Sequence, residues 1–123
     1  MKIKDMLLAA DEASGLLKAM ANRHRLIIIC QLAENERSVG ELADLLKIRD
    51  STVSQHLALL RKDKLVTARR DAQTIWYSIG NAAARELVRT LYRVYCGPEP
   101  ARRAKSGRKT VRAAQRRALA SNQ

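Results

Sequence analysis

Apolar positions recur at helical spacing in the first part of this chain. The intervals in the first segment are four and three residues, at Met6, Ala10, Ala13, Leu17 and Met20. This spacing predicts a helix over residues 5–20 with a single apolar seam. Asn22 is suited to cap a second helix. Its four consecutive apolar residues, Leu26 to Ile29, predict that neighbouring elements enclose it, and it should end near Glu34.

Two further helices separated by a tight connection are predicted next. Residues 38–47 are predicted to form a short amphipathic helix, and residues 48–50 join it to a second helix over residues 51–63. In this last helix Val53, Leu57 and Leu60 are spaced by four and three, so they form one buried stripe. Asp50 precedes the helix and is expected to cap it.

The pattern then changes from helical to β. Residues 65–70 and 74–79 are β-prone runs on either side of Asp71-Ala72-Gln73, which predicts a hairpin. A last helix over residues 81–95 has two apolar faces, one with Leu87, Leu91 and Val94, the other with Val88, Tyr92 and Tyr95. Helix, turn, helix and hairpin in this order predict a mainly α fold with a small β-hairpin wing, the winged helix-turn-helix.

The helix over residues 51–63 occupies the place of a DNA recognition helix. Its candidates for contacts with base edges or phosphates are Ser51, Thr52, Ser54 and Gln55. Gln55 is the best candidate for base readout, because its amide can pair with adenine through two hydrogen bonds. His56 suits either a phosphate contact or packing against the preceding helix. Arg61 and Lys62 are either contacts to the DNA backbone or simply exposed.

The predicted wing carries three more candidates, Arg69, Arg70 and Gln73. Their side chains could reach the minor groove or the flanking backbone of a duplex. The alternative is a hairpin whose arginines are only solvated.

The net charge of +12 is concentrated at the end of the chain. Residues 97–123 hold eight basic residues and one acid, Glu99, hence +7, which leaves +5 for residues 1–96. Two prolines and a glycine in Gly97–Pro100 end the folded domain. The basic tail, residues 97–123, is expected to be disordered until it meets DNA or another anion. Solubility is the other role open to it.

Composition excludes several classes of protein. No apolar run approaches the ~20 residues of a membrane span, and no signal-peptide pattern is visible, so a cytoplasmic protein is expected. The chain has no Phe, so its core should be aliphatic. No Cys-x-x-Cys motif, paired carboxylates or Ser/His constellation indicates an enzyme, a thiol oxidoreductase included.

The first and last helices carry more apolar surface than so small a domain needs. A homodimer formed through these helices would bury it and would place two recognition helices about one DNA turn apart. A palindromic double-stranded operator follows from that symmetry. The alternative is that a single chain satisfies both apolar faces by itself.

The order of elements and four segments together resemble the ArsR family of bacterial repressors. The segments are Ala21-Asn-Arg-His-Arg-Leu26, Ser38-Val-Gly-Glu-Leu-Ala43, Val53-Ser-Gln-His-Leu57 and the hairpin Leu65–Ser78. The resemblance covers residues 5–96 and implies a homodimer that binds operator DNA and releases it when an inducer arrives. Arg49-Asp50 departs from the Ser-Gln of many members, so an operator sequence cannot be transferred.

Many members of that family sense metals, but the ligand patterns are missing from this chain. Glu41–Leu45 stands where arsenic- and lead-sensing members have Cys-x-Cys. Zinc- and nickel-sensing members use Asp and His pairs on the last helix, whereas residues 81–95 contain neither. No metal and no cofactor are therefore expected.

Two cysteines remain, Cys30 and Cys96. Taken alone, Cys30 in its run of isoleucines is typical of an inert core residue. The pair, with Leu91-Tyr-Arg-Val-Tyr-Cys96 closing the last helix, is similar to the persulfide-sensing SqrR/BigR-like branch of the family. That similarity implies a sensing dithiol that is bridged by a disulfide or a longer sulfur chain, after which the protein leaves DNA.

The functional hypothesis is a repressor that responds to reactive sulfur species. Two alternatives stay open. One is a repressor that responds to peroxide or general disulfide stress. The other is a winged-helix protein that binds or compacts DNA without any inducer, for which cysteine substitutions would be silent.

Overall fold

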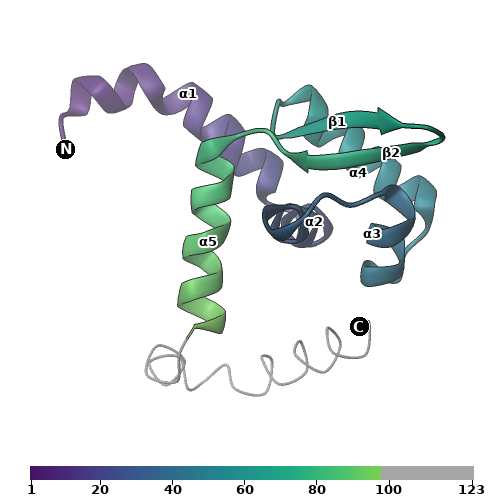
Figure 1. Cartoon of the computed structure of the whole chain (residues 1–123). Helices are drawn as coiled ribbons and strands as arrows, with labels where there is room; N and C mark the ends of the chain where they lie inside the picture. The colour runs from purple at the N-terminus through teal and green to yellow at the C-terminus, as the bar shows by residue number, and fades with distance from the viewer. Residues whose placement is uncertain (98–123) are drawn as a thin grey trace.

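The computed structural model describes residues 1–97, which form five helices and one two-stranded antiparallel sheet (Figure 1). In chain order the elements are α1 (Ile3–Met20), α2 (Arg23–Glu34), α3 (Val39–Leu46), α4 (Asp50–Lys62), β1 (Val66–Asp71), β2 (Thr74–Ile79) and α5 (Ala82–Cys96). This is the predicted winged helix-turn-helix, with α4 as its recognition helix and β1–β2 as its wing. The expectation of a disordered basic tail falls on residues 98–123, outside the described part.

None of the helices between residues 3 and 96 is long and apolar enough to span a bilayer.

Short polar side chains start three of the helices. Asn22 Oδ1 accepts from Arg25 N at 3.1 Å, as predicted, and Asn81 Oδ1 accepts from Ala84 N at 2.9 Å. Ser38 and Glu41 form a reciprocal capping box at α3. The prediction for Asp50 was wrong. Arg49 takes the N-cap position of α4 without a side-chain hydrogen bond, and Asp50 lies in the first turn, where its charge favours the helix dipole.

The hairpin turn is tighter than expected. Asp71 pairs with Thr74, so only Ala72 and Gln73 form the turn, and β1 begins and ends one residue later than predicted. Ala72 adopts a left-handed φ of 58°, which a two-residue hairpin turn requires.

An aliphatic core lies around α2, as the absence of Phe suggested. The fully buried large side chains are Ile28, Ile29, Leu42, Val53, Leu57, Leu60, Leu65, Val66 and Val88. The predicted α4 stripe is therefore confirmed, because all three of its residues are in this set. Burying one face of α4 leaves its opposite face on the surface.

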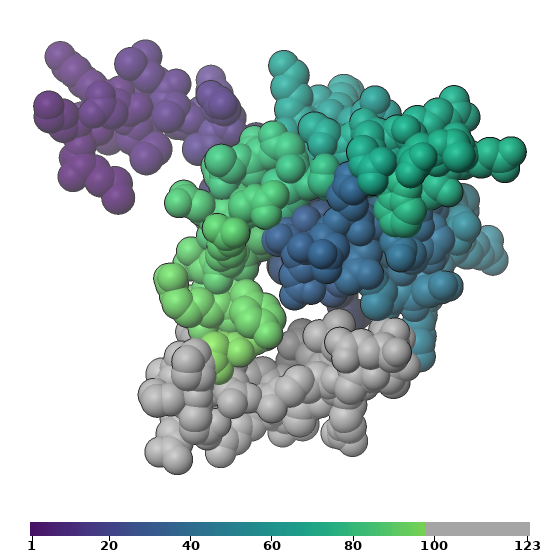
Figure 2. All heavy atoms as spheres, in the orientation of Figure 1, coloured from purple at the N-terminus to yellow at the C-terminus, as the bar shows by residue number. Residues whose placement is uncertain are grey.

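Helix α1 extends away from this core, and its first half stands apart from the rest of the molecule (Figures 1 and 2). Only Ala19 and Met20, at its end, are buried. Leu17 of the predicted seam remains 55% exposed, and Tyr92 on α5 is 63% exposed. Residues 1–97 alone therefore leave apolar surface on both helices open.

Candidate functional sites

The outward face of α4 gathers most of the residues predicted to contact DNA. Val53, Leu57 and Leu60 hold the helix against the core, so the remaining sides face outward. The exposed residues of the predicted set on this helix are Ser51, Ser54, Gln55, Arg61 and Lys62. Thr52 is only half-exposed. The helix thus presents hydroxyls and an amide near its start and two cations at its end.

A shallow hollow of about 370 Å³ separates α4 from the wing. It is lined by Ser54, Leu57, Ala58, Arg61, Lys62 and Tyr77. Two cations beside two hydroxyl groups are the donors that a phosphate group accepts from. Sequence reasoning missed Tyr77, because its place in β2 gives no sign that the strand faces the recognition helix.

His56 occupies a different place from its neighbours on α4. Its ring lies beside that of His24 on α2, with centroids 5.8 Å apart and planes tilted by 40°. The Nδ1 atoms of both rings are buried and lack a hydrogen-bond partner. Two roles were considered for His56, a phosphate contact and packing against an earlier helix. In the structure its ring packs against α2 and does not lie on the exposed face of α4.

The surroundings of His56 disfavour its protonation. Burial, followed by the nearby charges of Arg25 and His24 on α2, lowers the pKa of this imidazole below its ordinary value of 6.5. The α2–α4 contact therefore favours neutral His56.

This lowered pKa predicts a loss of stability in acid. As the pH falls through 6.5 the unfolded chain binds a proton at His56 while the folded chain does not, so folding becomes less favourable until the lower folded pKa is reached. Urea unfolding at pH 7.5 and 5.5 should show a larger drop for the wild type than for His56→Gln. Equal drops in both proteins would show that His56 is not the source.

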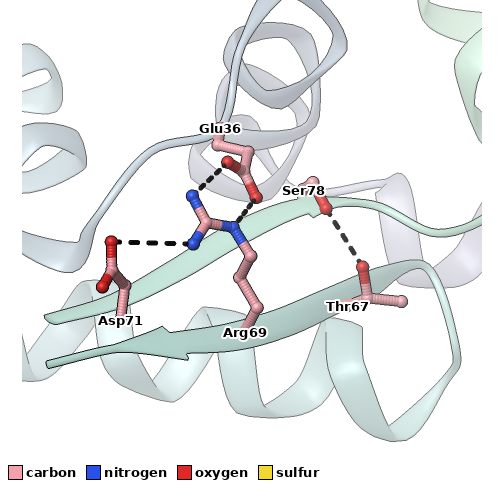
Figure 3. A network of polar contacts seen from close by, with 5 residues as sticks. All are labelled: Glu36, Thr67, Arg69, Asp71 and Ser78. Atoms are coloured by element: carbon pink, nitrogen blue, oxygen red, sulfur yellow. Dashed lines mark hydrogen bonds and ion pairs between the residues drawn. The ribbon is translucent and has the colours of Figure 1, made fainter.

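On the wing, the predicted DNA contacts differ in their availability. Arg69 Nε and Nη2 each donate to a carboxylate oxygen of Glu36 at 2.8 Å, and its Nη1 lies 3.9 Å from Asp71 Oδ2 (Figure 3). Arg70 and Gln73 are exposed, and no ion pair of Arg70 occurs among the described residues. Arg69 is thus already paired with carboxylates, whereas its neighbour is available.

The two cysteines lie on the helices that the sequence predicted, and both thiols are free. Cys30 on α2 is half-buried, and Cys96 is the exposed last residue of α5. Burial, then the charge of the Cys96 thiolate, then that of Glu34 raise the pKa of the Cys30 thiol to about 11. Helices α2 and α5 pack against each other, so the two cysteines lie on neighbouring elements.

Among residues 1–97, no three His, Cys, Asp or Glu side chains are grouped so that they could hold a metal ion.

A helix-turn-helix with a polar outward face and an adjoining wing defines a winged-helix DNA-binding regulator. Residues 22–68 match the model of the bacterial regulatory protein family arsR. The transcriptional activator HlyU of Vibrio cholerae is 45% identical over 96 residues, which cover 78% of this chain and 89% of that protein. The chain therefore belongs to the arsR family.

Other relatives agree with this membership. The biofilm growth-associated repressor of Agrobacterium fabrum is 43% identical over 90 residues, 73% of this chain and 77% of that protein. The crystal structure of the repressor BigR from Xylella fastidiosa superposes with a TM-score of 0.74 at 39% identity, covering 80% of this chain and all of that one. These relatives are transcriptional regulators, and this protein is a transcriptional regulator of the same family.

Proposed function

We propose that this regulator is a homodimeric repressor that releases its operator when reactive sulfur bridges Cys30 and Cys96. The observation that carries the proposal is the pair of free thiols on α2 and α5, one half-buried and one exposed, with the charge of one raising the pKa of the other. Two thiols are the minimum for a bridge, because one must receive the sulfur and the other must resolve the adduct.

The DNA-binding surface in this proposal consists of the exposed face of α4, the hollow beside it and the exposed Arg70 and Gln73 of the wing. Ser51, Thr52, Ser54 and Gln55 are assigned to the major groove, with Gln55 as the base-reading residue. Arg61 and Lys62 line the hollow and would bind phosphates there. We leave His56 out of this surface, because its ring packs toward α2.

The partner in the dimer is a second copy of this chain. The open apolar surface on α1 and α5 supports this assignment, because a second copy would remove it from water. Two-fold symmetry then brings two α4 helices to one face of the duplex, so the operator should be a palindrome.

The sulfur chemistry balances without a further oxidant. A cysteine thiolate attacks the outer sulfur of glutathione persulfide, a Cys–S–SH adduct forms, and the glutathione thiolate leaves. The second cysteine then attacks the adduct and hydrogen sulfide leaves. Attack on the original cysteine sulfur gives a disulfide, whereas attack on the added sulfur would give a trisulfide only from an adduct that carries one more sulfur atom.

A bridge can act on DNA binding through the helices that it joins. In the loop-entropy model, closing the 66-position separation restricts the chain by about 4 kcal/mol. A 100-fold loss of DNA affinity corresponds to about 2.7 kcal/mol. That part of the restriction must therefore act against the geometry that binds DNA and not against the others. Because α5 contributes to the proposed dimer and α2 packs under α4, tying them together would alter the spacing of the two recognition helices.

The test uses a duplex selected from a random-sequence library by the reduced full-length protein. Its binding is measured before and after glutathione persulfide, with intact mass read on the same samples. We expect about 100-fold weaker binding together with a Cys30–Cys96 bridge, and recovery after dithiothreitol.

Cys30→Ser and Cys96→Ser serve as matched controls, and both should bind the duplex yet keep it after persulfide treatment. A single-cysteine variant that responds like the wild type would contradict the two-thiol mechanism. Release by peroxide at a rate equal to that with persulfide would instead favour a sensor of general disulfide stress. If neither persulfide nor the cysteine substitutions changed DNA binding, an inducer-free DNA-binding protein would be favoured.

A further inference from the structure

The segment that leaves α2 runs alongside the wing and is bonded to it. Arg37 N donates to Tyr77 O at 3.0 Å, and Tyr77 N donates to Arg37 O at 2.8 Å, so the backbone of Arg37 pairs with β2 on the edge opposite β1. The Glu36–Arg69 ion pair joins the same segment to β1 (Figure 3). The Glu36–Arg69 ion pair therefore reaches across β2 and attaches β1, the strand farther from this segment, to the helical body.

The geometry of this pair leaves Arg69 little capacity for a phosphate. A guanidinium binds a carboxylate best through two parallel hydrogen bonds, and Arg69 makes both to Glu36. Asp71 lies beside the remaining terminal nitrogen. A phosphate that approached Arg69 would meet two carboxylates, and it would have to displace Glu36 to gain the same two bonds.

Arg70 is placed differently. Consecutive residues of a strand point to opposite faces, so its side chain leaves the wing on the side away from Glu36. It is exposed and has no ion-pair partner within residues 1–97.

From this arrangement we infer that Glu36 and Arg69 are positioning residues that fix the wing relative to α4, while Arg70 supplies the cation that the wing offers to DNA. The inference rests on the proposed function only in that the protein must bind a duplex. It assigns opposite roles to two adjacent arginines and gives an acidic residue outside the DNA surface a part in recognition.

The salt dependence of binding separates these roles. Each phosphate neutralised by a cation contributes about 0.9 to the slope of log affinity against log salt concentration. A positioning residue contributes nothing to that slope, although its loss weakens binding because the wing is no longer held in place.

The experiment measures affinity of the reduced full chain for the library-selected duplex between 0.1 and 0.4 M KCl, concentrations chosen to span about a fourfold range. Arg70→Gln should reduce the slope by about 0.9. Arg69→Gln should weaken binding severalfold with the wild-type slope. Glu36→Gln should likewise weaken binding severalfold with the wild-type slope, because it removes the carboxylate that holds Arg69, which lies on the face of the strand away from Arg70.

Three results would overturn the inference: a reduced slope for Arg69→Gln, an unchanged affinity for Arg69→Gln, or an unchanged slope for Arg70→Gln. Thermal unfolding of each variant checks that the fold is intact, and Glu36→Gln gives an independent reading should Arg69→Gln fold poorly. Failure of the wild type to select any duplex would instead contradict the proposed function, so the two failures are distinguishable.

Discussion

Replacing Leu17 by glutamate should dissociate the proposed dimer and weaken operator binding by about 100-fold or more. Leu17 belongs to the apolar seam of α1 and is 55% exposed in the described chain. In a dimer the new carboxylate would be buried against apolar side chains of the partner without a counter-ion, at a cost of about 3 kcal/mol or more. Each separated chain would then hold only one half of a palindromic site.

Leu8 provides a matched control on the same helix. It is 88% exposed, and a step of nine positions along an α-helix, from Leu8 to Leu17, makes two and a half turns, so the two side chains lie on opposite faces. Leu8→Glu should therefore leave both the dimer and DNA binding intact, and Leu17→Met should do the same by keeping the seam apolar. Sedimentation velocity gives the oligomeric state and circular dichroism the helix content.

If Leu8→Glu separated the two copies and Leu17→Glu did not, the dimer would use the other face of α1. A monomeric wild type with full operator affinity would remove the dimer from the proposed function altogether.

The order of the two sulfur-transfer steps gives the second large effect. Only the thiolate form of a cysteine attacks sulfur efficiently, and a pKa of about 11 leaves on the order of one Cys30 in several thousand ionised at pH 7.4. Cys96 is exposed at the end of α5. We therefore expect Cys96 to receive sulfur first and Cys30 to resolve the adduct.

Mass spectrometry of the single variants checks this order. Cys30→Ser should accumulate one added sulfur atom on Cys96 at the wild-type rate of the first step, without a bridge. Cys96→Ser should react at least ~10-fold more slowly, because its only thiol is half-buried and largely protonated. Faster labelling of Cys30 than of Cys96 would reverse the assignment.

The same pKa predicts how the bridging step depends on pH. Bridge closure requires attack of the Cys30 thiolate on the adduct at Cys96. The rate of closure should therefore rise about tenfold for each pH unit well below the Cys30 pKa of about 11, because the thiolate fraction rises by that factor. Stopped-flow mixing of the preformed adduct into buffers from pH 7 to 9 measures this slope. A flat profile would mean that deprotonation of Cys30 does not limit closure.

Much of the fold could be predicted from local features. The capping side chain of Asn22 and the stripe of Val53, Leu57 and Leu60 are encoded within a few positions of one another, so spacing alone indicates their roles. The change to alternating, β-prone residues located the wing in the same way. Errors were confined to element ends, as at Asp50, where the position of the cap depends on the geometry of the preceding turn.

The candidate site was predictable in its helix and less so in its wing. The outward side of α4 follows from its buried side, and this places Ser51, Ser54 and Gln55 on the surface without any tertiary information. Arg69 illustrates the limit, because Glu36 is 33 positions away and lies in a connecting segment with no pattern of its own. From sequence, Arg69 and Arg70 look equivalent.

The sequence by itself determined the elements, their order, the aliphatic core and the surface of the recognition helix, because each depends on neighbours a few residues apart. Only the tertiary structure decided which polar groups meet across the chain. It placed His56 against His24, bound Arg69 to Glu36, and packed α2, which carries Cys30, against α5, which carries Cys96. These contacts join side chains more than 30 positions apart, and their formation depends on how the helices and the wing pack rather than on any local pattern.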